Sequence, residues 1–108
     1  MTTTHVPAGS GDWLESPDGA GRFRILRLHD AGGATVEVSV RAGVEGKPHR
    51  HPAGEELVML EGQVEIDGIV LGPGDYLHTA PGAIHRARAV TDARFVLVLP
   101  TLPEYLDA

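Results

Sequence analysis

Residues 43–56 read Gly-Val-Glu-Gly-Lys-Pro-His-Arg-His-Pro-Ala-Gly-Glu-Glu, with histidines at positions 49 and 51 and a carboxylate at position 55. On an extended strand, side chains two positions apart point to the same face, so His49 and His51 face one side together. Glu55 follows a Pro-Ala-Gly bend, which can bring its carboxylate between the two rings. Neutral imidazole nitrogens and a carboxylate oxygen suit zinc, iron, manganese, nickel or copper, and this stretch therefore predicts a metal site.

A second stretch, residues 80–85, reads Ala-Pro-Gly-Ala-Ile-His and supplies a third histidine. We expect His85 to complete the ligand set if its strand packs opposite the first. Glu56, next to Glu55, is an alternative carboxylate. The competing interpretation is that these histidines are solvated residues of a loop beside a turn.

Composition limits both the size and the chemistry of the molecule. The 108 residues suffice for one core, and 14 glycines with 8 prolines predict many tight turns. The chain has no cysteine, which excludes disulfides and thiolate metal sites. A net charge of -6 argues against binding to nucleic acid, because neutralising phosphates needs a basic surface. The first residues lack a basic start and an apolar run, and no stretch is long enough to span a bilayer. We therefore expect a cytoplasmic protein that binds no membrane.

Short apolar or alternating runs, separated by turn residues, predict an all-β sandwich or barrel. No run has a convincing helical period. Val36, Val38 and Val40 share one face of a strand, and His85 shares a face with Ala87 and Ala89 if the intervening arginines face water. The expected strands cover residues 22–29, 34–41, 56–61, 64–67, 69–71, 76–79 and 94–99.

Three local features carry more particular expectations. Asp67-Gly68 predicts a tight hairpin, because a type I′ turn needs positive φ at both central residues. Residues 94–99 end in a run that is apolar on both faces, so we expect core on one side and another strand, the tail or a second subunit on the other. Arg22, Arg24 and Arg27 are interpreted as the solvated face of a strand.

The spacing of the histidine-rich stretch resembles the first motif of the cupin superfamily: Gly43, five residues, His49, one residue, His51, three residues, Glu55, six residues, Gly62. Residues 74–85, with glycines at both 74 and 82, resemble the second motif up to its histidine. Ala80 and Ala89 stand where that motif usually has proline and asparagine, neither of which is a ligand.

The resemblance implies an all-β jelly-roll barrel made of two packed antiparallel sheets, with the metal inside. It favours Glu55 over Glu56 as the carboxylate, because of the six residues before Gly62. One divalent ion per chain, whether zinc, iron, manganese, nickel or copper, would be held by His49, His51, Glu55 and His85.

Two kinds of function fit this resemblance. The first is a small metal-dependent enzyme of the dioxygenase, isomerase or lyase type, acting on a small oxygen-rich molecule in the barrel. Tyr76 and His78 are then the candidate catalytic residues beside the metal. The second is a non-catalytic zinc-binding module for ligand sensing or regulation. Trp13, residues 48–62 and residues 81–85 are similar to the cupin-like domain of ChrR-type zinc anti-sigma factors.

We expect residues 1–12 to form a flexible or partner-bound arm and residues 13–108 to form a single cupin domain. Trp13 is interpreted as the anchor that packs this arm onto the barrel or onto a neighbouring subunit. Cupins often pair through edge strands and swapped N-terminal segments, and an unpaired edge is a liability that pairing removes. The resemblance thus implies a homodimer. It also implies that each chain binds a small-molecule ligand or substrate.

Overall fold

The computed structural model describes residues 2–106, which form twelve strands. The larger sheet contains, in spatial order, β1 (Leu14–Glu15), β2 (Gly21–Leu28), β3 (Ala34–Val40), β11 (Ala93–Leu99), β5 (Glu55–Glu61) and β8 (Tyr76–Thr79). No helix in this part of the chain is long and apolar enough to cross a membrane.

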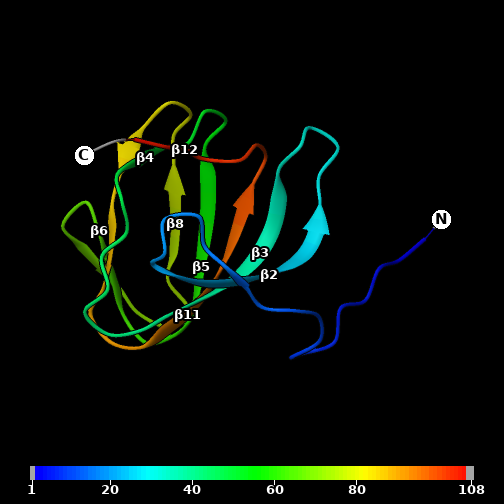
Figure 1. Ribbon diagram of the computed structural model, residues 1–108, viewed down its shortest axis with the longest axis horizontal. Helices are drawn as coiled ribbons and strands as arrows, with labels where there is room; N and C mark the ends of the chain where they lie inside the picture. The colour runs from blue at the N-terminus through cyan, green and yellow to red at the C-terminus, as the bar shows by residue number, and fades with distance from the viewer. Residues whose placement is uncertain (1, 107–108) are drawn as a thin grey trace.

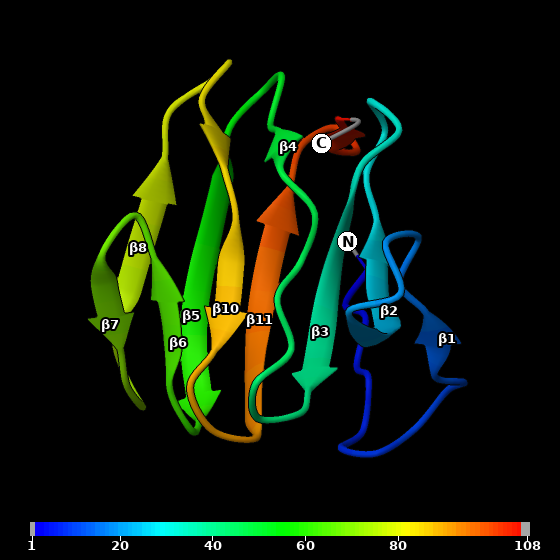
Figure 2. The ribbon, with the colours of Figure 1, turned by 60° about the vertical axis from the view of Figure 1, so that its left-hand side comes forward.

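A second layer faces the larger sheet (Figures 1 and 2). It consists of two three-stranded sheets. One contains β10 (Ala87–Ala89), β6 (Val64–Ile66) and β7 (Ile69–Leu71), and the other contains β12 (Glu104–Tyr105), β4 (His49–Arg50) and β9 (Ile84–His85). All strand pairs are antiparallel, so the expected jelly roll of two packed antiparallel layers is confirmed.

The core lies between the two layers and follows the two-residue period of the strands. On β3, Val36 and Val38 point inward and are buried, as the alternation predicts. The larger sheet adds Leu57, Met59 and Phe95 from β5 and β11. The second layer contributes Val64, Ile66 and Leu71.

The hairpin between β6 and β7 has the turn that its sequence predicts. Asp67 has a φ of 51° and Gly68 a φ of 77°. Both values lie in the left-handed region, as a type I′ turn requires. This turn fixes Ile66 opposite Ile69, and thereby the register of the hairpin.

The outer face of the larger sheet differs from the expectation at Arg24. Its side chain is not solvated: the residue is only 6% exposed, and its Nε donates to Glu37 Oε1 over 2.6 Å. Arg24 Nη1 also donates to the backbone oxygens of Pro7 and Ser10, over 3.4 and 2.7 Å. The N-terminal segment that carries these two carbonyls therefore covers the arginine. Arg22 and Arg27 are exposed, as expected.

Strand β11 is apolar on both faces, as the sequence predicts. Val96 and Val98 point to the outer face and are only half-buried. The neighbours of β11 are β3 and β5, which lie beside it in the same sheet. The described part of the C-terminal tail, residues 100–106, does not cover it, because β12 pairs with β4 in the second layer.

Candidate metal centre

Two short strands and one turn bring the three histidines together. His49 on β4 lies directly opposite His85 on β9 in the antiparallel pair. His51 follows β4 and begins a tight turn, in which Gly54 N donates to His51 O over 3.1 Å. Gly54 has a φ of 82°, and a Cβ there would lie 2.8 Å from Thr79 O, so only glycine fits. The turn leads straight into β5, whose first residue is Glu55.

The four side chains converge on one point. The ring centroids of His49, His51 and His85 lie 4.6 to 4.7 Å apart in all three pairs, with the rings edge to face. His51 Nε2 lies 2.9 Å from both His85 Nε2 and Glu55 Oε2. One ligand atom from each of the four residues falls within 4.8 Å of the others, so this cluster can hold a metal ion.

The chemistry of the donors fits a metal. Two facing imidazole nitrogens 2.9 Å apart can share only one proton, whereas an ion between them would bind both lone pairs. The far nitrogen of two rings already has a partner: His49 Nδ1 donates to Lys47 O over 2.9 Å, and His85 Nδ1 lies 3.4 Å from Thr79 Oγ1. Such contacts orient metal-binding histidines and leave Nε2 free. His51 Nδ1 is buried and has no hydrogen-bond partner among residues 2–106.

The electrostatics of the cluster favour a neutral His85. Burial lowers the pKa of His85, and the nearby rings of His49 and His51 lower it further, while the carboxylate of Glu55 acts in the opposite direction. Metal ligation needs the neutral imidazole, so this environment favours the ligating form. Three neutral rings and one carboxylate would leave a bound divalent ion with a formal charge near +1.

Tyr76 and His78, the candidate catalytic residues, do not reach the cluster. Along β8, Leu77 and Thr79 are the more buried residues, and alternation therefore turns Tyr76 and His78 to the exposed outer face. The Tyr76 hydroxyl donates to Glu56 Oε1 over 2.7 Å, and this hydrogen bond raises the pKa of Tyr76. Glu56 is thus exposed on the outer face, and Glu55 is the carboxylate that meets the histidines.

Tyr105 is a neighbour of the cluster that sequence reasoning missed. It lies opposite His49 in the β12–β4 pair, and the two ring centroids are 5.6 Å apart. Burial, with the charges of Asp18 and Glu55, raises the pKa of Tyr105 to about 12, so its phenol is protonated at neutral pH. Residues 100–105 show no periodicity and contain two prolines, and the only available signal was the tyrosine itself.

A cavity of about 570 Å³ opens between the layers, and the cluster forms part of its wall. His49, His51, Glu55, His85 and Tyr105 all line it. Its volume lies within the range of roughly 300–1,000 Å³ that is typical of small-molecule sites. The candidate metal centre is therefore accessible to a small molecule that fits this cavity.

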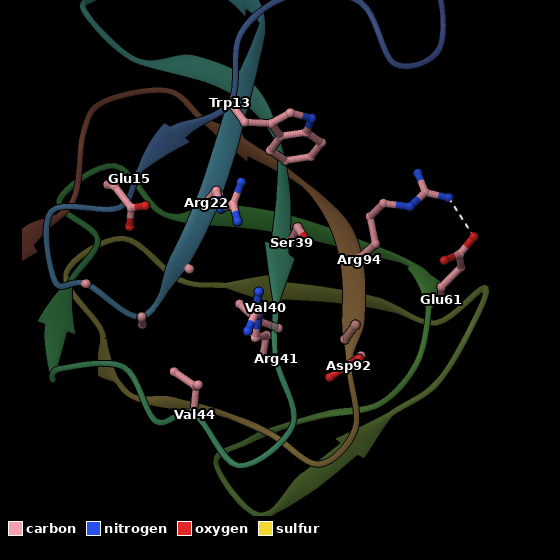
Figure 3. A pocket seen from close by; sticks show the side chains of 14 residues that line it. Trp13, Glu15, Arg22, Ser39, Val40, Arg41, Val44, Glu61, Asp92 and Arg94 are labelled. Carbon is pink, nitrogen blue, oxygen red and sulfur yellow. Dashed lines mark hydrogen bonds and ion pairs between the residues drawn. The ribbon is translucent and has the colours of Figure 1, made fainter.

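A second hollow, of about 690 Å³, lies outside the barrel on the larger sheet (Figure 3). Trp13 borders it on one side, and Arg94, paired with Glu61, borders it on the other. Arg22 and Asp92 bring further charges of both signs. None of the four cluster residues lines this hollow, and Trp13 does not line the cavity that contains the cluster.

The fold and the three-histidine, one-glutamate cluster define the class of protein: a cupin. The model of the ChrR cupin-like domain matches residues 2–103, and the chain belongs to this family. No curated protein matches the sequence significantly.

Solved structures with the same fold include two enzymes, by name, and a further cupin. An acetylacetone dioxygenase from Acinetobacter johnsonii is 15% identical, with a TM-score of 0.86 over 99% of this chain and 80% of that one. The polyketide cyclase RemF from Streptomyces resistomycificus is 18% identical, with a TM-score of 0.76 over 99% and 87%. An RmlC-like cupin from Ralstonia eutropha is 15% identical, with a TM-score of 0.86 over 99% and 74%. At these identities the likeness shows the fold alone.

Proposed function

We propose that this protein binds one divalent metal ion per chain through His49, His51, Glu55 and His85, and that it is a small metal-dependent enzyme of the dioxygenase, isomerase or lyase type. The convergence of these four side chains on the wall of an open cavity carries the proposal. A bound ion would supply Lewis acidity to an oxygen atom of a ligand in that cavity.

The residues around the cluster orient its histidine rings, provide a hydrogen-bond donor and exclude water. Lys47 O and Thr79 Oγ1 orient the rings of His49 and His85 from behind. Tyr105 offers a protonated hydroxyl at the cavity wall, which can donate a hydrogen bond to a ligand oxygen. Apolar walls around these groups exclude water and strengthen the electrostatic interactions inside.

Two similar structures, an acetylacetone dioxygenase and a polyketide cyclase, are enzymes by name, which supports catalysis on this fold. The alternative is a non-catalytic zinc-binding module for ligand sensing or regulation, and the match to the ChrR cupin-like domain favours it. The coordination number of the bound ion decides between these two functions. Zinc with all four ligands bound and no water is a closed site, whereas an octahedral iron or manganese ion keeps two positions open.

The first test is metal content. We expect about one divalent ion per chain, and loss of most of it in His51→Ala and in His85→Ala. His78→Ala is the matched control, because this histidine is exposed on the opposite face of the sheet. Elemental analysis of the four proteins after dialysis measures the difference. Full metal retention in either cluster variant would remove that histidine from the ligand set.

The second test is turnover. The metal-loaded protein should convert a small oxygen-containing compound, with product formation or O₂ uptake that depends on both substrate and metal. Glu55→Gln should abolish turnover while circular dichroism shows an intact fold, and Glu56→Gln should leave it unchanged. Four-coordinate zinc without bound water, together with no turnover across a panel of diketones, hydroxy acids and phenols, would favour the sensing module.

A further inference from the structure

The walls of the cavity are far less polar than the metal centre. Apart from the cluster, Tyr105 and a short polar segment at Ser16 and Asp18, its lining is aliphatic, aromatic or glycine. The apolar side chains come from both layers and include Phe23, Val36, Leu57, Ile66, Phe95 and Leu97. A ligand that fills this space must present mostly hydrocarbon to it.

The charges in the lining restrict the ligand further. Asp18 and Glu55 are its only acidic residues, and neither lysine nor arginine lines it within residues 2–106. A negatively charged group away from the metal would therefore be buried without a cationic partner, which is strongly unfavourable. The metal centre, with a formal charge near +1, can neutralise a single anionic oxygen.

The opening of the cavity is apolar as well. Ile25, Leu28 and Leu102 line the cavity and are 43%, 69% and 61% exposed, so they lie where it meets solvent. Ile25 and Leu28 belong to β2, and Leu102 belongs to the segment before β12. Exposed aliphatic side chains at an entrance favour ligands that shed water readily.

On the basis of the proposed metal site, we infer that the ligand is a compact molecule with an apolar body and one neutral or singly anionic oxygen-donor head group that binds the metal. Enolised diketones, phenols and monofunctional hydroxy acids have this form. Phosphate esters, dicarboxylates and sugar acids do not. The oxygen-rich substrate expected from the sequence is thereby narrowed to one with its oxygens at one end.

Straight-chain hydroxamic acids provide a probe that needs no turnover, because their singly charged head group chelates divalent metals and their alkyl chain can be lengthened. In metal-loaded protein, calorimetry should show affinity rising roughly fourfold per added methylene until the cavity is full. An analogue of equal length that ends in a carboxylate should bind at least tenfold more weakly. A flat series, or equal affinity for the carboxylate-ended analogue, would overturn the inference.

A substitution at the cavity entrance tests where the apolar part of the ligand lies. Ile25→Arg puts a cation at the entrance and should weaken the alkyl series while strengthening the carboxylate-ended analogue. Ile69→Arg is the matched control: Ile69 is 49% exposed, lies on β7 and does not line the cavity. It should keep the original order of affinities. An unchanged order in Ile25→Arg would overturn the assigned entrance.

The readouts separate this inference from the proposed function. Elemental analysis accompanies each titration, and both variants should retain about one ion per chain. Binding that depends on chain length, without any turnover, would contradict the proposed enzymatic function and support the inferred ligand class. Turnover of a polyanionic compound would support the proposed enzymatic function and contradict the inferred ligand class. A protein that takes up no metal would overturn both.

Discussion

Glu37 joins three strands through one buried carboxylate. Its Oε1 accepts from Arg24 on β2, and its Oε2 accepts from Arg94 on β11 over 2.6 Å. Arg94 in turn donates to Glu61 on β5 over 2.9 Å. Burial alone raises the pKa of Glu37, but the hydrogen bonds from Arg94 and Arg24 outweigh it, and the net shift is downward.

Glu37→Gln should therefore lower the free energy of unfolding at pH 7 by about 3 kcal/mol, because it leaves Arg24 buried without a charged partner. The folded pKa of Glu37 lies below its unfolded value, so its contribution is present above the unfolded pKa and is lost as the pH falls through the folded pKa. The difference between wild type and variant should shrink in acid. Urea unfolding at pH 7 and pH 3 measures both effects.

Glu65→Gln is the control for this experiment, because its ion pair with Arg88 is exposed. It should change the free energy of unfolding by less than about 1 kcal/mol. Equal stability of Glu37→Gln and wild type at pH 7 would contradict a stabilising role for the buried pair.

The cluster residues could be predicted from the sequence because ligand type and spacing are local properties. His49, His51 and Glu55 lie close together in the sequence, within residues 49–55, and the motif spacing favoured Glu55 over Glu56 as the ligand. The burial of Arg24 could not be predicted, because it depends on backbone carbonyls of Pro7 and Ser10, which leave no side-chain pattern in the sequence.

Among the secondary-structure elements, the longer strands follow from alternation and the shortest ones do not. The expected strand at residues 34–41 appears as β3, and the one at 94–99 as part of β11. Strands β4, β9 and β12 have two residues each, too few to show a period. These three strands form the sheet that carries His49, His85 and Tyr105. The position of Tyr105 next to the cluster could not be predicted for this reason.

Gly68→Ala tests the hairpin that the sequence did predict. A Cβ at Gly68 meets no atom within 4 Å, so the cost comes from its φ of 77° alone. We expect a loss of about 1–2 kcal/mol, the usual penalty for a side chain in the left-handed region. Gly72→Ala is the matched control, since this glycine is equally uncrowded and its φ is not positive. Thermal unfolding of both variants gives the comparison, and equal midpoints would contradict the role of φ.

The whole molecule exposes more surface than a compact monomer of its size. Its accessible surface is 6410 Å² for 11.4 kDa, whereas about 5,800 Å² is usual for this mass. Part of the excess comes from the N-terminal arm, the blue segment that runs away from the barrel in Figure 1. Another part is an apolar strip on the outer face of the larger sheet, made of Val58, Leu60, Tyr76, Val96 and Val98.

We propose that a second copy of the chain covers this outer strip. Glu56 and Glu61 lie on β5 at either end of Val58 and Leu60, so the apolar strip is bounded by charged residues along this strand. A two-fold axis through the strip would place the strips of the two copies in contact with each other. Apolar side chains that are exposed in one copy would thereby be buried in the pair.

Val58→Lys tests this pairing, because Val58 is 39% exposed at the middle of the strip. Wild type should sediment as a dimer at micromolar concentration, and the variant should sediment as a monomer with unchanged metal content. Ile69→Lys introduces the same charge on the other layer and should stay dimeric. A monomeric wild type, or a dimeric Val58→Lys, would contradict the proposed interface.

The position of Trp13 determines what optical spectroscopy can report about this protein. The chain has one tryptophan, and its indole lies on the outer hollow rather than in the cavity (Figure 3). Tryptophan fluorescence therefore monitors the outside of the sheet, where a change in hydration shifts the emission wavelength. Trp13 does not line the cavity, so we expect its emission spectrum to stay unchanged during a metal titration that reaches full occupancy.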